Sequence, residues 1–398
     1  MNSVTTADWD RRDQQGGWSP RRRSLIGACL AHCLHDGYTD QLYAFLPIWQ
    51  PQFGLSYAGL AVVRALYYGP MGGLQVPANH LIAKLSPGVA LALATFIAAA
   101  GFGVMTLPLG FPGLCIGLIL AGVGSSVQHP RASVLVTNSY GTSSRGPLGI
   151  YNFAGDVGKA VFPAVAALLL TAVAWRPVVG LMSVVGLAVG FMLLALVPRQ
   201  SGVTPAEEAT RATGRDGRGF GLLLTIGAFD TATRMGYLLF LPFLLNAKGG
   251  HGATTGVALA LVFAGGALGK ACCGWLGQRL GVVSSVIITE AATALFIVAT
   301  LILPLGPMLA VLPLLGVVLN GTSSVLYGTV PELAGSGEVG RAFALFYTGV
   351  IGAGGLAPIA YGFIADHSNR TVGIAAAAAT AAAIIPMTLA LRPRLNKL

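Results

Sequence analysis

The chain has 398 residues, of which 54% are hydrophobic and only 10% are charged, and its formal net charge is +10. Soluble proteins carry about 25% charged residues, so this composition excludes an ordinary soluble domain. The apolar residues form continuous runs rather than alternating ones, which excludes a membrane β-barrel. We therefore expect an all-α membrane protein.

Twelve apolar runs follow one another between Ser24 and Leu391. Each has about the 20 residues that a helix needs to cross a hydrocarbon core of ~30 Å. In chain order the runs cover residues 24–46, 57–80, 88–108, 113–138, 146–171, 175–197, 220–245, 253–277, 282–303, 308–330, 340–365 and 371–391. A polar, Arg-rich tail (1–23) precedes them and is expected to be disordered, and a short tail (393–398) follows. The sequence thus predicts twelve transmembrane helices.

The basic residues indicate how these helices are oriented. With both termini in the cytoplasm, the inner loops and tails hold 16 Lys and Arg residues, whereas the outer loops hold three, Arg176, Lys248 and Arg370. This asymmetry is the positive-inside pattern. We therefore expect a multi-pass protein of a bacterial inner membrane with cytoplasmic termini. The positive charge then reflects topology, and no nucleic-acid partner is needed to explain it.

A polar linker, residues 198–219, divides the chain into an N-terminal half (24–197) and a C-terminal half (220–392), with six runs in each. The two halves are related at an offset of about 195 residues, at which Asp36 matches Asp230 and Pro47 matches Pro242. Parallel six-helix repeats with a site at their interface are typical of one large class of secondary transporters. The repeat therefore predicts two six-helix halves related by a pseudo-two-fold axis.

Charged residues inside the apolar runs strengthen this interpretation. A charge near the centre of a bilayer costs roughly 2.5–3.5 kcal/mol on insertion scales and by default marks a pathway or relay. The chain has ten such charges, and acids and bases are equal in number. They are Asp36, Asp40, Asp156, Asp230, Glu290, Arg64, Arg131, Lys159, Arg234 and Lys270.

The first run places three polar residues on one helical face. His32, Asp36 and Asp40 are spaced i, i+4 and i+8, so their side chains lie above one another. Asp36 falls near mid-membrane, where a carboxyl group can change protonation as its surroundings change. We expect it to be the proton-coupling acid. The alternative is a static ion pair with Arg64 or Lys159.

The fifth and seventh runs each carry an acid and a base one turn apart. Asp156 precedes Lys159 by three residues, and Asp230 precedes Arg234 by four. Each pair could neutralise itself. The functional alternative makes the acids titrating groups and the bases ligands for an anionic substrate. Asp40 matches Arg234 at the repeat offset, so the two halves are expected to present different charges to a shared cavity.

Two loops carry a known signature, roughly Gly-x-Leu-x-Asp-Arg-x-Gly. It is recognisable in Gly274-Trp275-Leu276-Gly277-Gln278-Arg279-Leu280-Gly281, and its spacing recurs in Asn79-His80-Leu81-Ile82-Ala83-Lys84-Leu85-Ser86. From about residue 24 to 392 the chain resembles the major facilitator superfamily. In that family the acid belongs to an inter-helix latch that favours the outward-open state, and here Ala83 and Gln278 replace it. Lys84 and Arg279 keep the basic position and are expected to act in gating.

A closer resemblance lies in three short segments: His35-Asp36, Gly122-Val123-Gly124-Ser125-Ser126-Val127-Gln128-His129-Pro130 and Gly155-Asp156-Val157-Gly158. They look like the fosmidomycin-resistance group of the superfamily, which are proton-coupled exporters of small, often anionic compounds. The resemblance implies a central cavity lined by runs 1, 4, 5, 7, 10 and 11.

We assign the candidate residues to three roles. Proton coupling is predicted for Asp36, Asp156, Asp40 and Asp230. Substrate binding is predicted for His35, Arg64, Gln128, His129, Asn152, Lys159, Arg234, Asn320 and Tyr327. Gating is predicted for Lys270, Arg279 and Lys84, and Arg64 is an alternative gate residue. Glu290 and Arg131 are expected to be peripheral. Glu290 is expected either to pair with a group inside the bundle or to extend to the membrane–water interface, and Arg131 is expected to extend to that interface.

The function predicted from these features is secondary active transport by alternating access, as a monomer. The first hypothesis is proton-coupled export, by antiport, of a small organic compound or drug, in particular an anion. The second is proton-coupled uptake of an organic-anion nutrient, and a third is a non-transporting sensor or scaffold. Metal transport is a minor alternative, because no CxxC or Met-rich pair accompanies His32 and Cys33. We expect no enzyme activity, metal or cofactor, since the proton gradient supplies the energy.

Overall fold

The computed structural model describes residues 18–198, 217–333 and 339–395, apart from the side chains of residues 142, 145, 271, 274, 278, 339–341 and 344. Within these residues the chain consists of helices and short turns, without a strand. The predicted tail 1–23, linker 198–219 and tail 393–398 lie largely outside the described residues. The predicted all-helical class is confirmed.

The N-terminal half contains eight α-helices and one 3₁₀ turn. The helices are α2 (Pro20–Phe53), α3 (Tyr57–Gly73), α4 (Gln75–Leu81), α5 (Pro87–Thr106), α6 (Gly110–Ser125), α7 (Gln128–Tyr140), α8 (Arg145–Leu169) and α9 (Trp175–Leu196), and the turn η1 is Gly141–Ser143. Helix α2 starts before the predicted residue 24, because Ser19 caps it by accepting a hydrogen bond from the backbone N–H of Arg22 and Pro20 occupies its first turn.

The C-terminal half contains five longer helices. They are α10 (Gly217–Ala247), α11 (Gly252–Ile302), α12 (Leu305–Leu333), α13 (Val339–His367) and α14 (Arg370–Leu395). Helix α11 holds two of the predicted runs. They are separated by a kink at Gly281, whose φ of 77° lies in the left-handed region that glycine adopts readily.

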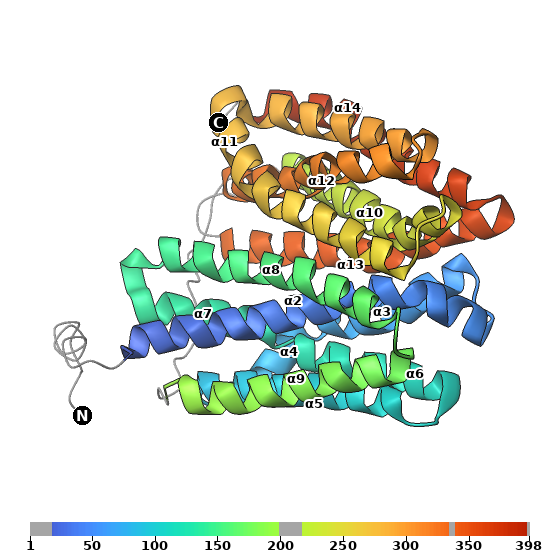
Figure 1. Ribbon diagram of the computed structural model, residues 1–398. Coiled ribbons are helices and arrows are strands. Elements are labelled where there is room, and N and C mark those ends of the chain that lie inside the picture. Colours follow the sequence, from blue (N-terminus) through green and yellow to red (C-terminus); the bar gives the residue numbers. More distant parts are fainter. Residues whose placement is uncertain (1–17, 199–216, 334–338, 396–398) are drawn as a thin grey trace.

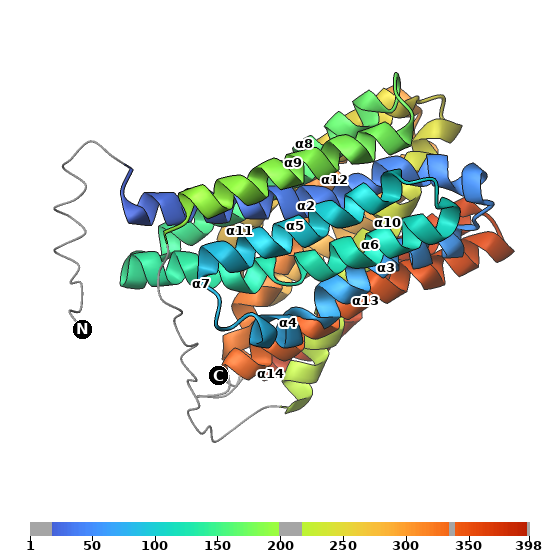
Figure 2. The ribbon, with the colours of Figure 1, turned by 90° about the horizontal axis from the view of Figure 1, so that it is seen from below.

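Figure 1 shows the two halves as two layers, with α10 to α14 above α2 to α9. Two equivalent contacts join them, because α3 packs on α13 and α8 packs on α11. Helices α2 and α10, the first of each half, also touch at the centre. Figure 2, seen from below, shows most of these helices running along a common direction. The observed arrangement agrees with the expected pair of repeats.

Eight helical stretches are long and apolar enough to cross a membrane: Pro87–Thr106, Gly110–Tyr140, Trp175–Leu196, Gly252–Gly277, Arg279–Ile302, Leu305–Leu333, Leu345–His367 and Arg370–Leu395. Helices α2, α3, α8 and α10 are not among them. All four carry charged residues of the predicted site, among them Arg64 on α3, and α3 has only 17 residues. The membrane fold is therefore confirmed, while the exact count of twelve spans stays a prediction.

Two predicted runs are broken, and one of them, 57–80, divides into α3 and α4 at Leu74. The run 113–138 divides into α6 and α7 between Ser125 and Gln128. Pro130 lies in the first turn of α7, where its missing N–H leaves no intrahelical hydrogen bond unmade. Beyond the break, Gln128 is buried and His129 is partly exposed.

Candidate functional site

A cavity of about 270 Å³ lies between the two halves. Helices α2, α3, α4, α7 and α8 line it from one side and α10 to α13 from the other. Its charged and titratable lining residues are His32, Asp36, Asp40, Tyr68, His129, Tyr151, Lys159, Arg234, Lys270, Tyr327 and Tyr347. Seven of these belong to the N-terminal half, so the cavity is chemically asymmetric.

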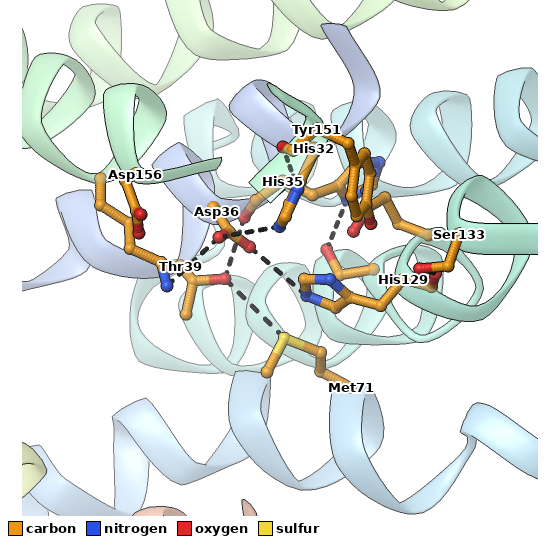
Figure 3. Close-up of polar contacts among 12 residues, drawn as sticks. His32, His35, Asp36, Thr39, Met71, His129, Ser133, Tyr151 and Asp156 are labelled. Carbon is orange, nitrogen blue, oxygen red and sulfur yellow. Dashed lines mark hydrogen bonds and ion pairs between the residues drawn. The ribbon is translucent and has the colours of Figure 1, made fainter. Parts of the chain in front are cut away.

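Asp36 is the centre of the polar network in this cavity. One carboxylate oxygen, Oδ2, lies 3.2 Å from Nζ of Lys159 and 3.2 Å from Nε2 of His32. The other, Oδ1, lies 3.4 Å from Nε2 of His129. Figure 3 shows the two imidazole rings approaching the carboxylate from different helices. Asp36 is 6% exposed, so the positive charge of Lys159 offsets much of the cost of burying it.

Two glycines allow α8 to approach α2 at this point. A side chain at Gly158 would meet the backbone oxygen of Cys33 at 2.0 Å, and one at Gly155 would meet Asp36 Oδ2 at 2.7 Å. Both positions therefore require the absence of a Cβ atom. This packing brings Lys159 to Asp36 and explains physically why the Gly155-Asp156-Val157-Gly158 segment carries glycine at both ends.

The network also fixes the orientation of the two histidines. Nδ1 of His32 lies 2.9 Å from the backbone oxygen of Tyr151, and the His32 ring stacks on the Tyr151 ring with centroids 4.1 Å apart. His129 approaches the edge of the His32 ring at 5.0 Å. Both rings are thus held next to the Asp36 carboxylate.

His32, Asp36 and His129 also have the composition of a metal site, since one ligand atom from each lies within 4.8 Å of the others. However, Lys159 contacts the same carboxylate oxygen as His32. A divalent cation there would meet a fixed positive charge. The geometry therefore favours exchange of protons over coordination of a metal.

The acid and base of α8 do not neutralise each other. Lys159 pairs with Asp36, whereas Asp156 forms an ion pair with Lys270 of α11 in the opposite half. Asp156 is not among the residues that line the cavity. The alternative of an internal Asp156–Lys159 pair is thus wrong in this conformation, because each side chain finds a partner on another helix.

Asp230 and Arg234 of α10 do not pair with each other either. Arg234 lines the cavity, and its guanidinium donates to Oδ1 of Asn320 at 3.4 Å and to Oγ1 of Thr231 at 3.3 Å. No ion pair joins Arg234 and Asp230, both of which the structure describes. Asp230 is 3% exposed and is not among the residues that line the cavity. Arg234 therefore keeps its charge available to a ligand.

The remaining substrate candidates divide into two groups. His129, Asn152, Asn320 and Tyr327 line the cavity. His35, Arg64 and Gln128 do not line it and are buried in the N-terminal half. A direct substrate contact for these three is therefore unsupported in this conformation.

The buried candidates have structural partners. His35 contacts the hydroxyls of Ser125 at 2.8 Å and Thr95 at 3.1 Å. Gln128 donates to the Tyr151 hydroxyl at 3.2 Å. These contacts connect α2, α5, α6, α7 and α8 behind the cavity wall.

Arg64 is the most unusual of these side chains, because its charge is 2% exposed and has no carboxylate partner among the described residues. Its guanidinium lies over the rings of Tyr43 at 4.5 Å and Tyr68 at 4.4 Å. Its Nη2 lies 3.3 Å from the sulfur of Met235 in the other half. Cation–π contacts thus replace the Asp36–Arg64 pair considered from the sequence.

The three gating candidates occupy different places. Lys270 lines the cavity and pairs with Asp156 across the halves, which fits a gate. Lys84 and Arg279 are exposed near the loops, and Arg279 contacts only the Trp275 ring, at 5.3 Å, among the contacts described. Their gating role remains a prediction.

An inter-half contact that the sequence analysis missed closes the opposite end of the bundle. The carboxylate of Asp366, at the end of α13, accepts hydrogen bonds from the backbone N–H groups of Tyr57 at 2.8 Å and Ala58 at 2.9 Å, at the start of α3. A negative charge is favourable at a helix N-terminus. The Tyr57 ring also packs on Phe240 and Phe243 of α10. No sequence motif predicts this role of Asp366, because the groups that donate to it are backbone N–H groups of a distant segment.

The fold and the site define a class: a helical membrane protein with two matched halves, a polar cavity between them and charged residues around that cavity is a transporter. The model of the Major Facilitator Superfamily matches residues 28–225. The chain belongs to this superfamily, whose members are transporters and not enzymes.

Two curated relatives from Escherichia coli (strain K12) cover most of the chain. The fosmidomycin resistance protein is 23% identical over 366 residues, 87% of each chain. The probable L-galactonate transporter is 25% identical over 382 residues, 87% of this chain and 83% of the other. The similarity to the fosmidomycin-resistance group expected from the sequence is confirmed.

Solved structures agree on the fold. A bacterial homologue of the human lysosomal transporter Spinster, in an inward-facing and unoccupied conformation, has a TM-score of 0.77 at 15% identity, covering 96% of this chain and 99% of that one. A POT family transporter in complex with a thioalcohol-conjugated peptide has a TM-score of 0.77 at 12% identity, covering 94% and 96%.

Proposed function

We propose that the protein is a proton-coupled secondary transporter of a small organic anion, working by rocking of its two halves around the central cavity. The observation that carries this proposal is the Asp36–Lys159 ion pair on the cavity wall, flanked by His32 and His129. It joins a proton acceptor and an anion-binding base in one contact.

The anionic substrate class is supported by the bases that face the cavity. Lys159, Arg234 and Lys270 come from three helices and both halves. Arg234 has only neutral partners, Asn320 and Thr231, so it is free to pair with a carboxylate or phosphonate. The name of one relative refers to L-galactonate, a sugar acid, which fits this class.

Coupling follows from competition for Lys159. An anion that binds Lys159 draws it away from Asp36, and the exposed carboxylate then takes up a proton. Conversely, a proton on Asp36 frees Lys159 for the anion. Each ligand therefore promotes binding of the other, and their joint movement through the cavity is symport.

Proton-coupled export is the second candidate, and the relative named for fosmidomycin resistance supports it. Export by antiport requires that proton and substrate bind alternately. A substrate that contacts Asp36 itself, rather than Lys159, would compete with the proton in this way.

The proposal includes a bacterial inner membrane, cytoplasmic termini and a monomer that needs no cofactor. The basic residues of the inner loops support the orientation. With that orientation, the Asp366 contact closes the outer end. Gln75 and Ser133, which line the cavity, lie towards the cytoplasmic end.

Transport in liposomes tests the proposal. Purified protein would be reconstituted with a pH-sensitive dye inside, and a panel of small carboxylates and phosphonates would be added outside. We expect substrate-dependent proton movement in wild type and none in Asp36→Asn. Movement of proton and anion in the same direction supports symport, and opposite directions support export. Absence of flux with every compound would contradict transport and favour a sensor or scaffold.

A further inference from the structure

Two carboxyl groups lie side by side in the C-terminal half, outside the cavity. Asp230 on α10 is 3% exposed and Glu290 on the second part of α11 is 1% exposed. Their side chains are within hydrogen-bonding range of each other. The sequence predicts a peripheral Glu290. Its contact with Asp230 depends on the packing of α11 against α10, which the sequence pattern does not predict.

A hydrogen bond between two carboxyl groups needs a proton. Ionised carboxylates only accept hydrogen bonds, so one group must be protonated to donate to the other. Two adjacent buried carboxylates also repel each other, and such pairs hold a proton where isolated acids do not. The observed contact is therefore the geometry of one proton shared between two acids.

Among the described residues, no contact neutralises both acids. Oε2 of Glu290 is buried and meets no hydrogen-bond donor among the described residues. Thr322 lies beside Glu290, but its hydroxyl donates to Oγ1 of Thr289 at 2.8 Å. Arg234, the nearest base, directs its guanidinium to Asn320 and Thr231 instead.

The titratable and polar groups that face the pair are few. They are Arg234 on α10, Cys273 on α11, and Thr322 and Tyr327 on α12. Among these only Arg234 carries a charge at neutral pH. One base facing two acids leaves one negative charge in excess, which a single proton removes.

We propose that Asp230 and Glu290 form a proton-binding site separate from Asp36, which holds one proton between the two carboxyl groups. This site goes beyond the coupling role of Asp36 and exists whether or not transport is driven by protons. Arg234 stands one helical turn from Asp230 and lines the cavity. An anion on Arg234 would therefore reduce the positive charge felt by the pair and strengthen its hold on the proton.

Infrared spectroscopy of the purified protein tests the proposal without requiring a substrate. Wild type at neutral pH is expected to show a carboxylic-acid C=O band that shifts in D₂O. Asp230→Asn and Glu290→Gln should each lose the component that belongs to the pair, because an amide donates the hydrogen bond without a titrating proton. Asp156→Asn, which removes an ion-paired acid, should retain it. A band unchanged in both Asp230→Asn and Glu290→Gln would overturn the proposal.

Sodium ion is the competing ligand, because two carboxylates and threonine hydroxyls are also hard oxygen donors. Loss of the pair's band when potassium is replaced by sodium at constant pH would assign the site to Na⁺ and overturn the proton assignment. An unchanged band in both salts supports it. If Glu290→Gln does not fold, the proposal is tested by the loss of the band in Asp230→Asn and by a pH titration of the band in wild type.

Discussion

The two halves of the molecule place an acid at the same point of the repeat but give it different neighbours. In the N-terminal half, Asp36 faces the cavity and contacts Lys159, His32 and His129. In the C-terminal half, Asp230 does not line the cavity and lies beside Glu290, while Arg234 lines the cavity. Matching positions of the repeat thus hold an ion pair at the cavity in one half and an acid beside another acid in the other.

The groups that contact an intramembrane acid, rather than its position in the helix, therefore determine whether it forms an ion pair or an acid–acid contact. Asp36 is 6% exposed and Asp230 is 3% exposed, so burial alone hardly separates them. What separates them is that a base reaches Asp36 and another acid reaches Asp230. This contrast leads to four experimental predictions.

The largest effect is expected from Asp36→Asn. It removes the carboxylate that is proposed to take up the proton and that Lys159 and both imidazoles contact. We expect substrate-dependent proton flux in liposomes to be lost, because the amide of Asn carries no titrating proton. The variant should still be extracted as a monodisperse protein, and full flux would contradict the role of Asp36.

Removal of one cavity base from each half, Lys159 or Arg234, tests whether the halves differ. Lys159→Met leaves Asp36 without its base, so both folding and anion affinity should suffer. Arg234→Met removes a base with neutral partners only, so anion affinity should fall roughly tenfold, by about 1–2 kcal/mol, with little loss of stability. Binding by calorimetry and thermal unfolding measure the two quantities. The double variant Asp36→Asn/Lys159→Met should recover the stability lost in Lys159→Met.

Asp366→Asn tests the contact that closes the far end of the bundle. The amide loses the charge at the N-terminus of α3, and the conformation closed at that end should lose about 1–2 kcal/mol, or roughly tenfold in population. Spin labels at Gln52 and Ser368 would report this as a longer distance between the halves. An unchanged distance distribution would show that the aromatic contacts of Tyr57 are sufficient.

The smallest effect is expected from Lys84→Ala and Arg279→Ala. Both side chains are exposed, and exposed substitutions usually change stability by no more than about 0.5 kcal/mol. We expect transport rates within about twofold of wild type. A larger loss in either variant would show that the loop bases latch another conformation, as the superfamily signature suggests.

Much of this architecture could be predicted from the sequence, because hydropathy, the charge asymmetry and the repeat are properties of single segments. The His32–Asp36 spacing likewise predicted a shared helical face, and the structure has it. The partners could not be predicted in this way. Asp156 and Lys159 are neighbours on one helix, yet each pairs with a different helix, because the approach of α8 to α2 depends on Gly155 and Gly158.

Residues whose partners are backbone groups or members of the other half were missed or misplaced for the same reason. Asp366 accepts from two N–H groups about three hundred residues away in the chain. Glu290 appeared peripheral because its helix was, and only the packing of α11 on α10 brings it to Asp230. Sequence spacing describes neighbours within a helix, not between helices.

The contacts of Arg64 and Tyr43 with Met235 affect how fast the two halves can rock. At mid-height the halves meet where the Met235 sulfur touches Arg64 and Tyr43, each at 3.3 Å. Thioether contacts are soft and weakly directional, so they resist a change of angle between the halves far less than an ion pair would. Among the described contacts between the halves, the Asp156–Lys270 ion pair and the Asp366 hydrogen bonds therefore resist rocking more than the Met235 contacts do, and a substitution at Asp366, which lies outside the cavity, should change turnover more than affinity.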